Sequence, residues 1–253
     1  MIQVKGLTKL YGEFVAVNEL DFEVQPGEVM GLVGPNGAGK TTTLRCLAGI
    51  IPPTRGSIHV CGHDLAQEPI PAKQQLAFLT DEPRLFDYLT VEQHLAFVAR
   101  IYQVLHYEPV AGQLLEELEL AGKKNAVPGE LSRGMKQKLA IACGLLHAPR
   151  VIYFDEPLTG LDPIGIRRMK DSILKRARDG AAIIISSHLL HLVEEICSHI
   201  LILKEGRKII HGTLGEITQK FAAQGGDTSL EEVFFRATVD AEKGTAAEPP
   251  LQK

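Results

Sequence analysis

The sequence predicts an α/β protein whose mostly parallel β-sheet is covered by helices on both faces. Short apolar runs alternate with amphipathic helical segments in the second half of the chain, as in VIYFDE (151–156) and AAIIIS (181–186). Strands that are apolar throughout are typical of parallel sheets with both faces buried. Two further observations complete the fold class: residues 1–30 indicate an antiparallel β part, and a helical lobe at about 85–148 interrupts the alternation.

The first third of the chain divides into strands, a glycine-rich loop and a helix. Alternating apolar residues and the Pro26-Gly27 turn predict antiparallel strands within 1–30. EVMGLVG (28–34) is a short apolar strand that runs into the glycine-rich loop, and a helix is expected at 41–50. The further strands expected in this part are GSIHV (56–60) and QLAFL (75–79).

Helical spacing defines the inserted lobe. VEQHLAFVARIYQVL (91–105) and VAGQLLEELELAG (110–122) carry apolar residues every three or four positions, with no strand between them. SLEEVFFRAT (229–238) is the last amphipathic helix. Residues 239–253 have no apolar pattern and are expected to form a disordered tail. The segments expected between lobe and last helix are a strand at 151–156, a helix at 164–178, a strand at 181–186, a helix at 189–197, a strand at 199–204 and a hairpin at 206–212.

The composition fits a globular cytoplasmic protein. The chain has 253 residues, 45% of them hydrophobic, and a net charge of −4, which gives no overall attraction to nucleic acid or anionic membranes. Its 4 cysteines are scattered without CxxC spacing, which indicates free thiols in a reducing cytosol. No signal peptide is seen, and no apolar run approaches the ~18–20 residues of a membrane span. If the protein serves a membrane process, another chain is therefore expected to supply the membrane part.

Two patterns suggest other ligands but have simpler structural explanations. Histidine and cysteine alternate in HVCGHD (59–64), as metal ligands can, but the glycine within it is typical of a hairpin turn and no further ligand cluster follows. The basic run RRMKDSILKRAR (167–178) places its charges opposite an apolar face, as in a solvated helix. It contains no interleaved aromatic residues, so nucleic-acid binding is not expected.

The strongest motif is GPNGAGKT (34–41), which fits the phosphate-loop pattern GxxxxGK(S/T) in full. Its glycines let backbone amide groups approach phosphates closely. Lys40 is expected to reach the β- and γ-phosphates of a nucleotide and to act in catalysis, and Thr41 to bind Mg²⁺ through its hydroxyl. The expected nucleotide-binding residues here are Gly34, Pro35, Asn36, Gly37, Ala38, Gly39, Lys40, Thr41 and Thr42.

Two acids end the apolar strand VIYFDE. A buried strand rarely ends in paired carboxylates without a compensating cation nearby. Since the same chain carries a phosphate loop, we expect Asp155 to hold Mg²⁺, directly or through water. Glu156 is expected to be catalytic, orienting and deprotonating the water that attacks the γ-phosphate.

A second helix start also faces anions. In LSRGMKQ (131–137), Ser132 occupies an N-cap position, so free amide groups face outward there. Through Leu131, Ser132 and Gly134 this motif resembles the LSGGQ signature of the ATP-binding-cassette (ABC) ATPases. The resemblance covers 1–238 as one ABC ATPase domain. It implies a P-loop NTPase (RecA-like) core with an N-terminal antiparallel β-subdomain and an inserted α-helical signature subdomain.

Three further residues fall in the family's order of motifs. Tyr11 stands where the family's aromatic residue stacks on adenine. The sequence Gly160-Leu161-Asp162 resembles the D-loop, and His188 follows the strand IIISS, as does the switch histidine that contacts the γ-phosphate. The resemblance therefore implies that Tyr11 and Asp162 take part in nucleotide binding and that His188 takes part in catalysis.

The resemblance also implies partners. The chain would be the ATP-hydrolysing, Mg²⁺-dependent subunit of an ABC transporter. Two such cassettes, identical or homologous, face each other head to tail, so that Ser132 and Gly134 serve the nucleotide of the partner. ATP would then favour the closed pair and drive a conformational cycle. The pair would dock on a separately encoded integral membrane permease at the inner face of the cell membrane.

The end of the chain bears on the direction of transport. SLEEVFFRATV resembles the end of cassettes that serve bacterial multidrug, antibiotic or polysaccharide exporters, and export is therefore favoured over import. The alternatives are a soluble ABC ATPase that acts on ribosomes or DNA, and a P-loop kinase, which would not need a signature helix.

Two positions depart from the family pattern. Asp81 aligns with the Q-loop glutamine, which touches Mg²⁺ and senses the membrane partner; we expect Asp81 to keep the metal role, although its charge adds repulsion near the phosphates. Arg133 replaces the first signature glycine, and it either reaches the phosphate of the partner's nucleotide or points into solvent. A permease helix is expected to insert between Leu79 and Leu95, near Asp81.

Overall fold

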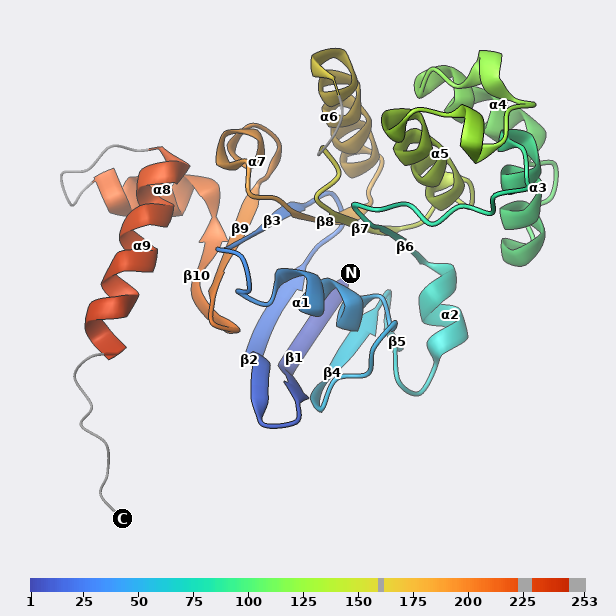
Figure 1. Ribbon diagram of the computed structural model, residues 1–253. Coiled ribbons are helices and arrows are strands. Elements are labelled where there is room, and N and C mark those ends of the chain that lie inside the picture. Colours follow the sequence, from blue (N-terminus) through green and yellow to red (C-terminus); the bar gives the residue numbers. More distant parts are fainter. Residues whose placement is uncertain (159–161, 223–228, 246–253) are drawn as a thin grey trace.

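The computed structural model describes residues 1–158, 162–222 and 229–245, and these contain two β-sheets. In spatial order, the six-stranded sheet consists of β10 (Arg207–Thr213), β9 (His199–Lys204), β3 (Val29–Val33), β8 (Ala182–Ser186), β7 (Val151–Asp155) and β6 (Leu76–Leu79). The four-stranded sheet consists of β2 (Phe14–Val24), β1 (Ile2–Tyr11), β4 (Arg55–Val60) and β5 (His63–Asp64). In Figure 1 the smaller sheet lies beneath one face of the larger one.

The central strands of the larger sheet run parallel. β3 pairs in parallel with β8 and β9, and β7 pairs in parallel with β8 and β6. Every residue of β3, β7 and β8 is buried, which is why their sequences are apolar throughout instead of alternating. The predicted mostly parallel sheet is thus confirmed. Its geometry brings the carboxyl ends of neighbouring strands, and the loops that follow them, to one edge.

The larger sheet separates two hydrophobic cores. Along β7, Tyr153 faces the core that the sheet shares with the antiparallel strands and with α1 (Lys40–Leu47), while Ile152 and Phe154 face the other core. That second core includes the buried faces of α6 (Pro163–Arg178) and α7 (Leu190–Ile196). Figure 1 shows these two helices on the opposite side of the sheet from α1. Both strand faces are therefore covered, and the loops at the strand ends are held in place from two sides.

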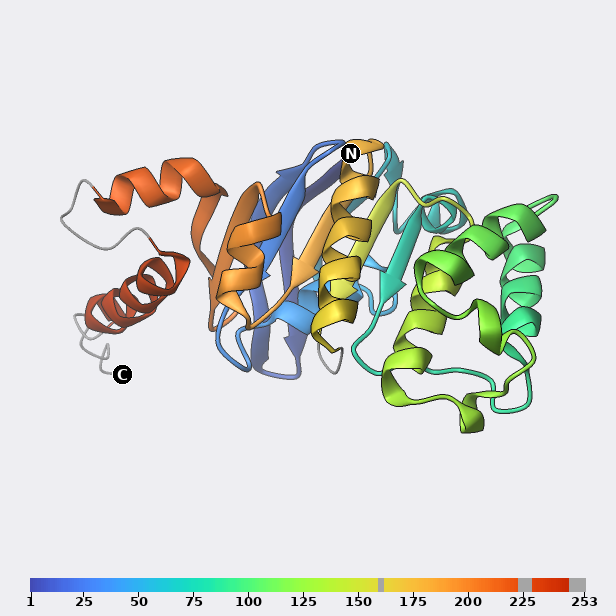
Figure 2. The same ribbon diagram turned by 90° about the horizontal axis from the view of Figure 1, so that it is seen from above.

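The C-terminal helices differ from the sequence expectation. α8 (Leu214–Ala222) and α9 (Leu230–Thr245) lie at the β10 end of the sheet, opposite the helical lobe (Figure 2). A disordered tail was expected from residue 239, whereas α9 continues to Thr245; residues 246–253 lie outside the described part. The added turns contain alanine, glutamate and lysine, which favour helix without any apolar pattern. None of the described helices is long and apolar enough to span a membrane.

The helical lobe is inserted between β6 and β7. It contains α3 (Val91–Tyr102), α4 (Glu108–Glu117) and α5 (Arg133–Leu145), with 3₁₀ turns at Ala121–Lys123 and Pro128–Glu130. A capping box starts α3. Thr90 Oγ1 accepts a hydrogen bond from the Gln93 backbone amide, and Gln93 Oε1 accepts one from the Thr90 backbone amide. Apolar residues of the lobe, such as Leu95 and Leu139, are almost wholly buried in the second core. The lobe therefore packs on the sheet instead of forming a separate core.

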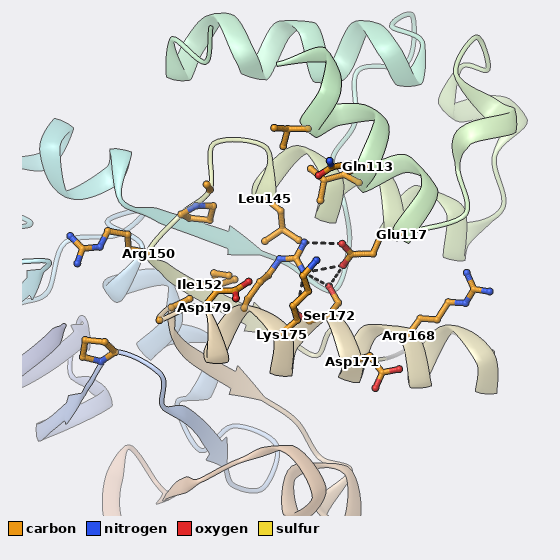
Figure 3. Close-up of a pocket in the computed structure, with 18 of the residues that line it drawn as sticks. Gln113, Glu117, Leu145, Arg150, Ile152, Arg168, Asp171, Ser172, Lys175 and Asp179 are labelled. Carbon is orange, nitrogen blue, oxygen red and sulfur yellow. Dashed lines mark hydrogen bonds and ion pairs between the residues drawn. The ribbon is translucent and has the colours of Figure 1, made fainter. Parts of the chain in front are cut away.

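Polar contacts also join the lobe to α6, across a cavity of about 940 Å³. Glu117 at the end of α4 accepts hydrogen bonds from Arg176 at 2.9 Å and from Ser172 at 2.6 Å. Figure 3 shows Glu117 of α4 facing Ser172 of α6. Burial by itself raises the pKa of Glu117, but the hydrogen bonds from Arg176 and Ser172 and the Arg176 charge outweigh it, so the net pKa is lowered. The Glu117 carboxylate thus stabilises the attachment of the lobe while it is ionised.

We predict that Glu117→Gln lowers the free energy of unfolding by about 1–3 kcal/mol at pH 7, because it removes charge-assisted hydrogen bonds. A lowered folded-state pKa means that the stabilisation is present above the unfolded pKa of about 4.3 and is lost as pH falls through the folded value. The difference from wild type should therefore shrink below about pH 4 in denaturant titrations. Glu116→Gln, at the exposed neighbouring position, is the control. Equal losses in both variants, or a loss independent of pH, would contradict this assignment.

Candidate nucleotide-binding site

The phosphate-loop residues connect the end of β3 to the start of α1. Gly39 has φ of 100° and is the N-cap of α1, where it supplies no side-chain cap. A Cβ at Gly39 would lie 2.5 Å from the carbonyl oxygen of Ala16, and one at Gly34 would lie 2.4 Å from that of Leu203. Both positions therefore require glycine. The first amide groups of α1 have no acceptor one turn earlier and no side-chain cap, which is an arrangement that suits phosphate.

Lys40 lies across this loop. Its Nζ donates to the carbonyl oxygen of Gly34 at 2.7 Å and to that of Pro35 at 3.2 Å. Burial lowers the pKa of the ammonium group, while the nearby carboxylates of Glu156 and Asp155 act in the opposite direction. A half-buried cation bonded only to neutral carbonyl groups is available to exchange them for phosphate oxygens.

Asp155 connects the phosphate loop to two strands. Its Oδ1 accepts from the hydroxyl of Thr41 at 3.3 Å and from the buried hydroxyl of Ser186 at 2.6 Å. Asp155 is 7% exposed, at the end of β7, and Ser186 ends the neighbouring β8. A carboxylate and a hydroxyl held together in this way are the oxygen ligands that Mg²⁺ prefers. The residues present thus fit the expected metal.

Glu156 is held beside His188. Its backbone has φ of 53°, an uncommon conformation for a residue other than glycine, and its amide donates to the carbonyl and hydroxyl oxygens of Ser186 at 3.2 Å each. One carboxylate oxygen lies 2.8 Å from Nδ1 of His188. The positive φ turns Glu156 out of the strand direction, so its carboxylate meets the histidine instead of the core. Such outliers are common at functional sites.

A groove of about 940 Å³ extends from this cluster toward the helical lobe. Thr41, Asp81, Asp155 and Glu156 line it at the nucleotide side, and Leu79 and residues of α3 line it at the lobe side. Leu95, expected as a wall, is buried in the core at 1% exposure; His94, Phe97, Val98 and Tyr102 form the wall instead. The equally large cavity beside Glu117, between α4 and α6, includes none of the phosphate-loop residues and is not part of the nucleotide site.

The structure therefore brings Lys40, Thr41, Asp155, Glu156 and His188 together, as expected from sequence. Other predicted residues lie apart from this cluster in the described contacts. Ser132 caps α5 by accepting from the Met135 amide at 3.3 Å, next to Gly134. Asp162 caps α6 by accepting from the Gly165 amide at 2.7 Å, whereas Gly160 and Leu161 lie outside the described residues. Tyr11 ends β1, with Lys9 Nζ 5.2 Å from its ring centre.

Two residues near the site, Ser186 and Gln137, were not predicted from the sequence. Ser186 bonds to both Asp155 and Glu156, and Gln137 of α5 donates to the carbonyl oxygen of Thr80 at 3.1 Å, next to Asp81. The polar ending of the apolar strand IIIS was a signal for Ser186, comparable to the acids that end β7. The HVCGHD segment forms the β4–β5 hairpin, in which His59 and His63 lie near Asp64 and Glu68 at 3.8 and 3.2 Å.

Comparison with known proteins decides the family. Residues 17–159 match the sequence model of the ABC transporter family. The chain belongs to this family. The ABC-type transporter ATP-binding protein EcsA of Bacillus subtilis is 32% identical over 94% of this chain and 96% of its own length. The bacitracin transport ATP-binding protein BcrA of Bacillus licheniformis is 36% identical over 82% of this chain and 68% of its own length.

Solved structures agree with the family. An ATP-binding subunit of an ABC transporter superposes with a TM-score of 0.89, at 35% identity, over 94% of this chain and 99% of its own. A dimeric ATP-binding cassette bound to ADP and phosphate has the same fold, with a TM-score of 0.75 at 24% identity over 84% of this chain and 98% of its own. This ABC protein is thus an ATP-binding subunit with the P-loop NTPase fold, and an ATPase.

We predict that Glu156→Gln lowers the rate of ATP hydrolysis by about 10²–10⁴-fold and leaves ATP binding intact. Gln has the same shape but cannot accept the proton of the attacking water. Phosphate release and nucleotide binding should be measured on the same preparations. Glu92→Gln, an exposed position in the first turn of α3, is the matched control. Hydrolysis within threefold of wild type in Glu156→Gln would remove Glu156 from the catalytic role.

Proposed function

We propose that this chain pairs head to tail with a second cassette around two ATP molecules and powers a separately encoded membrane permease, as an exporter. The observation that supports this best is that one chain has two phosphate-facing helix starts, at α1 and at α5. The start of α1 lies with Asp155 and Glu156, while the start of α5 carries Ser132 on the helical lobe. A nucleotide held by both would have to lie between two chains.

The residues of one chain perform distinct parts of the hydrolysis. Backbone amide groups of the phosphate loop and the Lys40 ammonium hold the phosphates, and Tyr11 stacks on adenine. Thr41, Asp155 and Asp81 would hold Mg²⁺, which would supply electrostatic stabilisation for phosphoryl transfer. Glu156 accepts the proton of the attacking water. His188, 2.8 Å from the Glu156 carboxylate, keeps it in position and contacts the γ-phosphate.

The opposing cassette completes each site. Ser132 Oγ and the Gly134 amide, at the start of α5, bind the γ-phosphate held by the other chain, and Asp162 at the start of α6 lies at the same interface. These contacts exist only in the closed pair, so ATP binds that state more tightly than the open one. This difference in affinity drives closure of the pair, and ATP hydrolysis allows the pair to open again.

The groove beside Asp81 supports docking of a membrane partner. Phe86 and Phe97 border it and are 53% and 40% exposed, respectively. Apolar side chains gathered at a groove are typical of a surface that receives a helix. A short helix of the permease would contact both the lobe and the loop that carries Asp81. Docking of this kind would hold the chain at the inner face of the cell membrane.

Export is supported by the relatives. Similar proteins are named for bacitracin transport, multidrug transport and Nod factor export. Those cargoes belong to those proteins, and the substrate here is set by the permease. One of these names specifies export and the other two specify transport, and in the proposed exporter this chain supplies the ATP hydrolysis.

Affinity purification of the tagged chain from detergent-solubilised membranes tests this function. We predict that a stoichiometric multi-spanning protein co-purifies and that Phe97→Asp abolishes its recovery, because a charge in the groove opposes docking. Val110→Asp on α4 is the control, since Val110 has the same 40% exposure outside the groove. Recovery of ribosomes or DNA with a soluble protein would overturn the transport function while leaving the ATPase assignment intact.

A further inference from the structure

The two residues that depart from the family pattern contact each other. Asp81 follows β6 and Arg133 is the first residue of α5, and Arg133 Nη2 lies 3.6 Å from Asp81 Oδ1. This oxygen is shielded from solvent and has no hydrogen-bond partner in the described part of the chain. A carboxylate oxygen in that situation requires a nearby cation. The contact therefore accounts for both departures at once.

The local electrostatics explain why the pair is needed. A positive side chain in the first turn of a helix is disfavoured by the helix dipole, and the first turn of α5 contains no acid of its own. Asp81 supplies the missing negative charge from outside the helix. In return, Arg133 offsets a carboxylate that lines the same groove as Asp155 and Glu156. Without it, three acids would face the phosphates together.

We propose that Asp81 and Arg133 act as a single unit in which Arg133 is a positioning residue. Its guanidinium neutralises and orients the Asp81 carboxylate, so that the loop after β6 can carry an acid next to the triphosphate. Because the ion pair spans this loop and the first turn of α5, it also ties the metal side of the site to the signature helix of the same chain. This inference rests on the proposed place of Asp81 beside the nucleotide.

In the proposed unit, the Arg133 side chain acts on Asp81 of its own chain. A guanidinium engaged by Asp81 does not contact the phosphate of the partner's nucleotide, which is the other role open to a basic residue at this position. The two roles predict different couplings. If Arg133 acts through Asp81, its removal matters only when Asp81 is present; if it binds the nucleotide directly, its removal matters in any background.

The test is a double-mutant cycle on ATP binding without metal. Wild type, Asp81→Gln, Arg133→Gln and the double variant are titrated with ATP in EDTA at low ionic strength by calorimetry. Arg133→Gln should weaken ATP binding about three- to fivefold, as expected for loss of a partly exposed ion pair, and this loss should fade at high salt. In the Asp81→Gln background the same substitution should change the dissociation constant by less than twofold. Arg133→Lys should restore most of the affinity.

Controls separate folding and function from this inference. Thermal unfolding of each variant establishes that it is folded, and Arg100→Gln, an exposed arginine on α3, reports the effect of losing one positive charge elsewhere. An equal loss of affinity on removing Arg133 in both backgrounds would overturn the proposal in favour of direct nucleotide contact. No loss in either background would also overturn it. Absence of ATP binding by wild type would instead contradict the proposed function.

Discussion

The hydrogen bonds received by Asp155 connect the fold to the chemistry. Oδ1 of this residue accepts from Thr41 on α1 and from Ser186 at the end of β8, while Asp155 itself ends β7. One buried carboxylate thus joins the phosphate loop to two adjacent parallel strands. Because parallel pairing aligns the carboxyl ends of β3, β7 and β8, their loops lie close enough for this contact. Lys40, Glu156 and His188 take their places around it.

Polar contacts connect the helical lobe to the nucleotide site and to α6. The lobe carries α5, whose first turn is connected through Arg133 to Asp81 and whose Gln137 binds the Thr80 carbonyl. At the far side, Glu117 holds α4 to Arg176 of α6. Polar contacts thus attach the lobe beside the nucleotide site, through Asp81 and Thr80, and on the far side to α6, in addition to its apolar packing on the sheet. A movement of the groove that is proposed to receive the permease would reach the nucleotide site through the contacts of Asp81 and Thr80.

The sequence predicted those parts of the site whose residues are adjacent in the chain. The phosphate loop and the pair Asp155-Glu156 are short motifs with a fixed spacing, and apolar runs predicted the parallel sheet correctly. Two contacts between distant residues were not predicted. Ser186 lies beside Asp155, and Arg133 lies beside Asp81, because of strand order and the packing of the lobe. The polar ending of IIIS and the unusual residue at position 133 do not by themselves specify these partners. The helix through Thr245 was also missed, because helix-favouring residues without an apolar face resemble a disordered tail.

The proposed function requires each ATP site to be shared by two chains. The most direct measurement is the specific activity of purified protein at saturating Mg²⁺ and ATP over a range of protein concentrations. In the proposed pair, Ser132 and Gly134 of one chain complete the site of the other, so activity per chain should rise with concentration and level off when the pair is fully formed. Activity per chain that stays constant down to the lowest measurable concentration, in protein shown by sedimentation to be monomeric, would contradict the shared site.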